Sequence, residues 1–334
     1  MKKILALLLL STLLFAFLVS CNDPEPTPDG TVNVYVEKDH DTVSAKMATG
    51  EIEIAVLPEP KATAAILAAR NAGQNYSIKL NLSTEWDKVS STALTMGCII
   101  VRNEFLTAHE GAAVEFLKEY KNSIEFIGNK DNKTEAANMI VSAGILPKLP
   151  IAQSALTNLD GSIVYMDSEN MKNALVGFYD AIGISRPDDS FYYSKNDSAQ
   201  TDNTKIKIGV MNGPTGMGMA KLINDYGMNS DKYEFQLFST PETAVAAFTA
   251  GEIDFACIPT NAAANLANKK SNFVSVAAIN CLGSLYVVVK DGVEINSIAD
   301  LKDKNVYYGV KTSTTEPILK HIITNNNLEL KVFE

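Results

Sequence analysis

The chain carries one twelve-residue segment twice, as Thr49-Gly-Glu-Ile-Glu-Ile-Ala-Val-Leu-Pro-Glu-Pro60 and as Ala250-Gly-Glu-Ile-Asp-Phe-Ala-Cys-Ile-Pro-Thr-Asn261. The two copies align without a gap. In each copy the glycine suits the end of a helix, the apolar run suits a buried strand, and the proline ends strand pairing. Each copy therefore predicts a helix, a strand and then a loop, which is the repeating unit of α/β proteins.

A second, weaker pair supports the same interpretation. Met96-Gly-Cys-Ile-Ile-Val-Arg102 resembles Leu282-Gly-Ser-Leu-Tyr-Val-Val-Val-Lys290. Helix-to-strand turns are common in α/β proteins, so the first pair alone also fits two unrelated units. Two pairs in matched context predict two similar lobes that face each other.

The rest of the chain alternates short β-type runs with helical patterns, which favours parallel sheets covered by helices on both faces. Strands are expected at 32–36, 52–57, 98–101, 206–211, 253–258, 285–289 and 306–310. Helices are expected at 41–48, 61–72, 107–127, 133–143, 168–182, 217–226, 241–249 and 316–325. The predicted fold class is α/β.

The first twenty residues have the features of a secretory signal peptide. Lys2 and Lys3 precede an apolar run over 4–19, and small residues follow. This run is too short for a typical membrane span. Residues 1–20 are therefore predicted to be removed during export.

Cys21 follows this leader and is the predicted lipid anchor. The stretch Leu18-Val-Ser-Cys21 resembles a lipobox, whose cysteine receives a diacylglycerol; plain secretion is the alternative. Residues 21–30 contain three prolines among acidic residues and little apolar material, so they are expected to form an extended spacer.

Composition restricts the possible functions. The formal net charge of -10 disfavours nucleic-acid binding. A hydrophobic content of 46% suits one large or two medium packed domains. Cys98, Cys257 and Cys281 lie in apolar stretches without CxxC spacing, so buried free thiols are expected.

The sequence offers little for catalysis. His40, His109 and His321 are scattered, with His109 and His321 on helical segments that look exposed. No nucleophile elbow or HExxH motif is present. Asp39-His40-Asp41 is read as a solvated loop, since further metal ligands at a fitting spacing are lacking. We therefore expect no enzyme activity, no metal and no cofactor.

Most of the mature chain resembles a known family. Residues 205–320 resemble the first part, and residues 32–193 the second part, of substrate-binding proteins of ABC importers, with a type II periplasmic-binding-protein-like fold, in the nitrate, sulfonate and taurine group. The resemblance is carried by the segments 205–218, 251–261 and 297–304, and by 50–60, 84–86, 96–102 and 116–121. The usual second part comes first, so the chain resembles a circularly permuted member.

The resemblance implies a two-lobed fold with two hinge strands. One lobe is expected from 31–97 plus 290–334, and the other from 98–288. The hinge strands would be 98–101 and 285–289. The polar stretch 194–204 would be the permutation linker, because it joins the usual ends of the family.

Two terminal segments compete for one strand position. Both 32–36 and 330–333 have strand character, and the sequence leaves open which one occupies the position in the sheet.

The ligand-binding residues are expected in loops at the carboxyl ends of strands, where open α/β sheets bind ligands. A tight turn for 212–218 and helix capping for 311–317 are the structural alternatives. The candidates are Asn212, Gly213, Pro214, Thr215, Gly216, Met217, Thr260, Asn261, Asn280, Thr312, Ser313, Thr314, Thr315, Pro58 and Glu59.

The expected function is that of a monomeric solute-binding lipoprotein on the outer face of the cytoplasmic membrane. It would capture a small molecule between its lobes and deliver it to an ABC permease and ATPase complex. Two alternatives remain: an enzyme of related fold in the biosynthesis of a pyrimidine precursor, and a ligand-sensing lipoprotein without a transporter.

Overall fold

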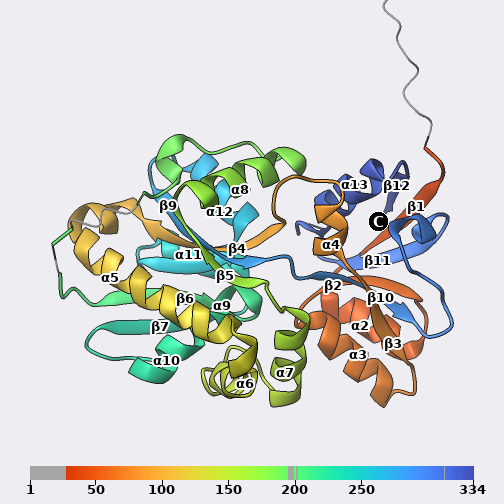
Figure 1. The fold of residues 1–334 in the computed structure, drawn as a ribbon, viewed down its shortest axis with the longest axis horizontal. Coiled ribbons are helices and arrows are strands. Elements are labelled where there is room, and N and C mark those ends of the chain that lie inside the picture. The colour runs from red at the N-terminus through yellow and green to blue at the C-terminus, as the bar shows by residue number, and fades with distance from the viewer. Residues whose placement is uncertain (1–27, 195–198, 201, 312) are drawn as a thin grey trace, which may run out of the picture.

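Two lobes, each built on a six-stranded sheet, lie side by side (Figure 1). The computed structural model describes residues 28–194, 199–200, 202–311 and 313–334. The first sheet has the order β12 (Glu329–Phe333), β1 (Thr31–Glu37), β11 (Asn305–Gly309), β2 (Ile54–Pro58), β10 (Leu285–Lys290) and β3 (Tyr76–Asn81). The second has the order β5 (Ile163–Met166), β9 (Val274–Leu282), β4 (Thr95–Arg102), β8 (Phe255–Pro259), β6 (Ile206–Met211) and β7 (Tyr233–Phe238).

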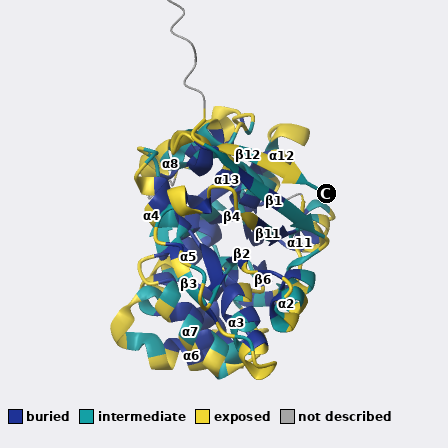
Figure 2. Cartoon of the chain, turned by 90° about the vertical axis from the view of Figure 1, so that its right-hand side faces the viewer, coloured by how far each residue is buried: buried dark blue, intermediate teal, exposed yellow. Residues whose placement is uncertain are grey.

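Helices cover both sheets and turn their exposed faces outward, while the central strands are buried (Figure 2). The first lobe contains α2 (His40–Thr49), α3 (Lys61–Asn71), α4 (Leu82–Asp87) and α13 (Thr315–Asn325). The second contains α5 (Asn103–Gly128), α6 (Lys133–Ser142), α7 (Leu149–Asn158), α8 (Ser168–Ala181), α9 (Pro214–Met217), α10 (Ala220–Tyr226), α11 (Pro241–Thr249) and α12 (Thr260–Lys269). The predicted α/β class and two-lobed architecture are confirmed.

The chain crosses from one lobe to the other twice. Each crossing leads into a strand, β4 or β10, that runs antiparallel to both of its neighbours. In the second sheet β4 lies between β8 and β9, and in the first sheet β10 lies between β2 and β3. The chain passes between the sheets after β3 and again at Gly283 and Ser284. At the second passage the Gly283 N–H donates to the Leu94 carbonyl over 2.8 Å, so the two passages lie against each other.

The sheets refine the expected lobe boundaries. The strand expected at 285–289 pairs in the first sheet, although the sequence division placed 98–288 in the other lobe. The chain crosses between the lobes at Gly283–Ser284, because β9 pairs with β4 up to Leu282 and β10 pairs with β2 from Leu285. The division of the whole chain into two lobes stays a proposal beyond this pairing.

The internal repeat occupies equivalent places in the two sheets. The backbone N–H of Arg102, ending β4, donates to the carbonyl of Asp254 over 3.0 Å. The backbone N–H of Lys290, ending β10, donates likewise to the carbonyl of Glu53 over 2.8 Å. In the second sheet β4 therefore lies beside β8, and in the first sheet β10 lies beside β2 in the same way. The two sequence pairs are similar because the same structural unit is used twice.

Strand β1 occupies the position for which two segments competed. It pairs in parallel with β11 on one side and with β12 on the other, so β12 forms the edge of the sheet. The Asp29 N–H donates to the Asn327 carbonyl over 2.8 Å, which holds the start of β1 beside the end of α13.

Helix α5 departs from the helix expected at 107–127, and α7 and α12 were not expected. Helix α5 begins earlier than predicted and has a non-helical residue at His109, with φ -140° and ψ 42°. The described part of the polar stretch 194–204 lies against this kink: His109 Nδ1 is 2.6 Å from an Asp202 carboxylate oxygen. A Cβ at Gly111 would lie 1.7 Å from the Gln200 carbonyl, so only glycine permits this approach.

Candidate functional site

The carboxyl ends of β6, β8 and β9 meet at the lobe boundary, next to the start of β4. Pro259, the last residue of β8, is in register with Gly97 of β4. Thr260 begins α12, and its hydroxyl donates to the Thr95 carbonyl over 3.0 Å. This geometry concentrates polar groups at one edge of the second sheet, as expected for an α/β binding protein.

Asn280, near the end of β9, is the best-defined polar group at this edge. Its side chain is 2% exposed, and its Nδ2 donates to the Thr215 carbonyl and to the Tyr120 hydroxyl, both over 3.0 Å. A carbonyl oxygen can only accept a hydrogen bond, so the contact with Thr215 fixes the orientation of the amide. The amide oxygen, Oδ1, is left as an acceptor.

Three buried polar atoms in this region have no partner within the described structure: Asn280 Oδ1, Thr95 Oγ1 and Ser83 Oγ. Such atoms cost free energy, because they lose water without gaining a protein partner. Gly97 leaves room for Asn280, since a Cβ there would lie 2.6 Å from its Oδ1.

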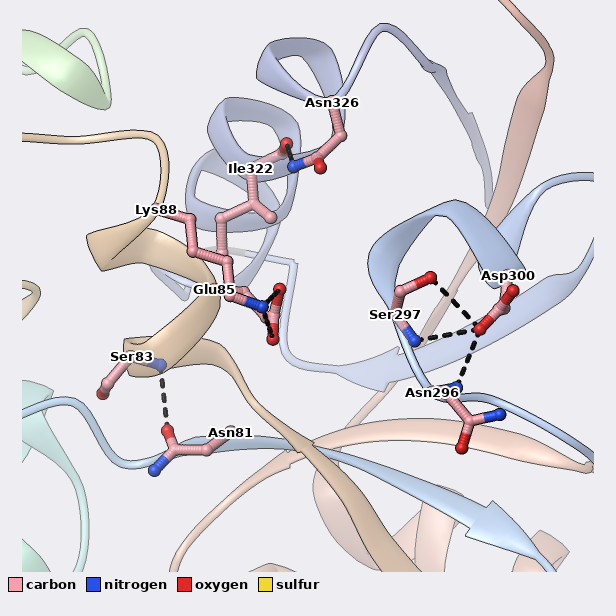
Figure 3. Close-up of polar contacts among 9 residues, drawn as sticks. All are labelled: Asn81, Ser83, Glu85, Lys88, Asn296, Ser297, Asp300, Ile322 and Asn326. Carbon is pink, nitrogen blue, oxygen red and sulfur yellow. Dashed lines mark hydrogen bonds and ion pairs between the residues drawn. The ribbon is translucent and has the colours of Figure 1, made fainter.

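Ser83 brings the first lobe to the same boundary. Its backbone N–H donates to the Asn81 side chain over 2.9 Å, which caps α4 at its start (Figure 3). The cap uses the backbone group only, so the hydroxyl stays available. A Cβ at Gly283 would collide with this hydroxyl, which places Ser83 directly beside the passage between the sheets.

The loop after β6 lies next to the loop after β2 of the first lobe. Gly213, after β6, has φ 114°, a value that favours glycine, and a Cβ there would lie 3.7 Å from Pro60 Cδ of the first lobe. The Glu59 N–H, just after β2, donates to the Ser284 carbonyl over 2.8 Å. The loop after the first repeat strand therefore lies at the lobe boundary, beside the loop after β6 and Ser284. Pro259, which ends the second repeat strand, reaches the same boundary through its pairing with Gly97.

Glu59 is a buried carboxylate that joins the lobes. It is 1% exposed and accepts hydrogen bonds from the Thr63 hydroxyl at 2.8 Å and from the side-chain amide of Asn158 on α7. The Tyr286 hydroxyl donates to the Asn158 carbonyl over 2.6 Å. Burial raises the pKa of the Glu59 carboxyl, and the hydrogen bonds from Asn158 and Thr63 oppose that shift.

The predicted loop 212–217 divides into exposed and buried parts. Asn212 is exposed, and its side chain lies 3.4 Å from the Ser239 hydroxyl. Pro214 starts the short helix α9, and Thr215 is half-buried. Gly216 packs against the backbone, since a Cβ there would lie 1.9 Å from the Met211 carbonyl, and Met217 lies in the hydrophobic core. The expected helix at 217–226 is interrupted at Gly218 and begins again as α10.

The matching loop of the first lobe is mainly a helix start. The Ser313 hydroxyl accepts from the Thr315 N–H over 3.3 Å, and Thr314 is the N-cap of α13 without a side-chain cap bond. Thr315 is buried, while Pro58 and Asn261 are half-buried. Thr312 lies outside the described residues, as do Cys21, the signal peptide 1–20 and most of the spacer 21–30.

The three described cysteines and the single tryptophan are buried. Cys98, Cys257 and Cys281 are buried free thiols, as predicted, and burial raises the pKa of the last two to about 12. Trp86 is fully buried against Phe178 and packs on His321, with a ring-centroid distance of 4.5 Å to the imidazole.

Both histidines expected on exposed helix faces are engaged. His321 is covered by Trp86, and His109 is bonded to Asp202. Within the described ranges no cluster of His, Cys, Asp and Glu suits a metal ion. Among the same residues, no helix combines the length and apolar character needed to cross a membrane.

Asn280 and Glu59 were named as candidates from the sequence, whereas several other residues at this boundary were not. Thr95 starts a strand, Ser83 lies in a short helix, Tyr120 lies inside a long helix and Asn158 ends one. A search restricted to the carboxyl ends of strands cannot reach them. The only available signal was the position of Thr95 just before the repeated Gly97 segment.

The chain was also compared with known proteins. No protein-family model matches it, and no curated protein matches it either. Among solved structures, an ancestral arginine-binding protein bound to arginine is 11% identical, with 88% of this chain and 91% of that chain covered and a TM-score of 0.30.

Two further structures are similar at the same level. A phosphate-binding protein of a phosphate ABC transporter from Streptococcus pneumoniae is 10% identical, covering 83% and 92% of the two chains, with a TM-score of 0.29. A putative methionine-binding lipoprotein from Bacillus subtilis is 10% identical, covering 89% and 92%, with a TM-score of 0.28. The architecture of this chain therefore rests on its own sheets, strand order and lobe passages.

Proposed function

We propose that this protein is a solute-binding lipoprotein that captures a small molecule between its lobes and delivers it to an ABC permease and ATPase complex. The observation that carries the proposal is the set of unpartnered buried polar atoms of Asn280, Thr95 and Ser83 at the lobe boundary. A solute held there would satisfy them, and contacts from both lobes would favour the closed state. Cys21 would anchor the protein to the outer face of the cytoplasmic membrane.

We also propose that the chain is a circularly permuted member of the nitrate, sulfonate and taurine group. The order of the parts supports this, because β1 completes a sheet whose neighbouring strand β11 comes from the other end of the sequence. The linker 194–204 would replace the usual ends. Permutation leaves the strands in place, so it would preserve the site.

Native mass spectrometry of the mature protein, followed by thermal-shift screening, tests the solute-binding function. A bound small molecule should appear as added mass, and its re-addition should raise the melting temperature. The matched control is the same protein with Gly213→Leu, which places a large side chain against Pro60. Equal retention by both proteins, or retention by neither, would contradict binding between the lobes.

Membrane attachment needs a separate test. Cys21→Ser should move the protein from the membrane fraction of the expressing cell to the soluble extracytoplasmic fraction. Unchanged partitioning would contradict anchoring through Cys21.

A further inference from the structure

Building on the proposed solute-binding function, we infer that the solute is recognised as a hydrogen-bond donor, and that it is an uncharged or cationic nitrogen compound and not an inorganic or sulfonate anion. Asn280 has a side-chain amide with a single orientation. Both Nδ2 hydrogens are used, one by the Thr215 carbonyl and one by the Tyr120 hydroxyl. Only Oδ1 is free, and an amide oxygen accepts hydrogen bonds and cannot donate them.

The contacts behind Asn280 hold this orientation in place. The Tyr120 hydroxyl receives the Asn280 hydrogen bond and lies 3.5 Å from Cys257 Sγ. Burial strongly raises the pKa of Tyr120, so its hydroxyl stays protonated and can donate to the sulfur. Reversal of the amide would put Oδ1 against the Thr215 carbonyl, where two acceptors would face each other.

The charged groups near the boundary also disfavour an anion. Glu59 places a buried carboxylate between the lobes. Lys61, the first residue of α3, is paired with Asp41 at 2.7 Å, and Lys311, which follows β11, is paired with Glu334. The lysines that follow β2 and β11 are thus held in exposed ion pairs, whereas the oxygens of Asn280, Thr95 and Ser83 have no partner among the described residues.

The loop after β6 offers no substitute for a cation. Helix α9 has four residues and begins with proline, which lacks an N–H group, so it presents little of the donor array that binds anions at helix starts. The hydroxyls of Thr95 and Ser83 can accept or donate, and they add contacts without reversing the preference set by Asn280. The matching solute chemistry is an amide, amidine or amine N–H directed at Asn280 Oδ1.

Equilibrium dialysis of the purified full chain against a bacterial small-molecule extract tests the inference, with mass spectrometry of what the protein retains. A retained solute with an N–H group and no net negative charge supports it. Retention of nitrate, sulfate or a sulfonate overturns the inference and leaves the solute-binding function standing. Retention of nothing overturns both.

Two matched amide and carboxylate pairs provide defined probes: nicotinamide against nicotinate, and glutamine against glutamate. The two members of each pair differ at one group, which is an amide with N–H donors in one and a carboxylate that only accepts in the other. A thermal shift with an amide and none with its carboxylate agrees with the inference. Preference for the carboxylates contradicts it.

Variants of Asn280 then test whether the solute contacts Asn280 Oδ1. Asn280→Leu removes the acceptor and should weaken binding of the retained solute at least tenfold, whereas Asn280→Asp keeps an acceptor and should weaken it less. Thr95→Val gives a second measurement if Asn280→Leu fails to fold, because it removes a hydroxyl without a protein partner. Asn224→Leu, on the exposed face of α10, is the control for adding leucine. Unchanged affinity in both site variants would overturn the assignment.

Discussion

Glu59, just after the last strand residue of the first repeat, accepts a hydrogen bond from Asn158 of α7 across the boundary between the lobes. The bond places a carboxylate in a buried position that its sequence context, between two prolines, does not suggest. Thr63 donates to the Glu59 carboxylate, and Tyr286 donates to the Asn158 carbonyl. The four residues therefore connect α3, β10 and α7.

Replacement of Glu59 should change how stability depends on pH. Burial raises the pKa of this carboxyl above its unfolded value, so its protonation stabilises the folded protein. This contribution is fully present below the unfolded pKa and is lost as pH rises through the folded pKa. Melting temperatures measured across the range above about pH 4.5 should fall less steeply for Glu59→Gln than for the wild type. Parallel pH profiles would contradict this assignment.

Thr95→Val should leave the ligand-free protein as stable as the wild type or slightly more stable. Its hydroxyl is buried and has no partner in the described structure, so its loss removes an unsatisfied group. Chemical denaturation measures the free energy of unfolding.

Ser123→Ala is the comparison for Thr95→Val. The Ser123 hydroxyl is also buried, but it donates to the Gly218 carbonyl over 2.6 Å and accepts from the Leu222 N–H over 3.2 Å. Its loss should lower the free energy of unfolding by about 1–2 kcal/mol. If Thr95→Val lowered the free energy of unfolding more than Ser123→Ala, the Thr95 hydroxyl would have a structural partner.

Asp254→Ala should destabilise the second lobe strongly. Asp254 pairs with Arg102 at 2.7 Å and also accepts from the Lys207 N–H over 3.0 Å, in a largely buried setting. Truncation leaves the guanidinium without this partner and should cost about 3 kcal/mol. Glu104→Ala is the control, because Glu104 pairs with the same arginine from an exposed position and should cost less than about 0.5 kcal/mol. Equal effects in denaturant titrations would refute the distinction.

Trp86 should report lobe movement by its fluorescence. It is the only tryptophan, and it lies between Phe178 of the second lobe and His321 of the first. Separation of the lobes would expose the indole and shift its emission to longer wavelength, and solute binding should reverse the shift. Emission that is insensitive to every binding solute would indicate that α4 and α8 stay together during closure.

Truncation after Leu328 should be tolerated. It removes β12, an edge strand with mostly exposed residues, while β1 keeps its pairing with β11. Val34→Asp is the contrasting change, because Val34 is fully buried in β1, and it should unfold the lobe or lower its melting temperature far more. Similar melting temperatures for the two proteins would contradict the position assigned to β1.

The sequence predicted those strands whose side chains follow a regular pattern. The two Gly-Glu-Ile strands were found because their apolar runs end in proline, and their symmetric placement followed. Strand β9 was missed because Ser275, two alanines and Asn280 separate its β-branched residues, so the segment shows neither a continuous apolar run nor a clear alternation. Strand β7 was also missed, although its alternation of aromatic and polar residues over Tyr233–Gln236 is a strand pattern.

The candidate site was predicted only where it follows from strand ends. Asn280 and Glu59 met that rule, whereas the bond from Asn158 to Glu59 joins residues 99 positions apart and depends on how α7 packs against α3. The burial of Trp86 depends likewise on two lobes meeting at α4 and α8. Such contacts are set by tertiary packing, and a linear pattern does not record them.

The position of β1 has a mechanical consequence for a tethered molecule. Because β1 begins three residues after Pro28 and is hydrogen-bonded on both sides, any attachment upstream of it holds the lobe that contains β1, β11 and β12. With the lipid anchor proposed at Cys21, that lobe would stay fixed beside the membrane. The lobe that carries Asn280 would then be the one that moves on closure and presents a changed surface to the proposed permease.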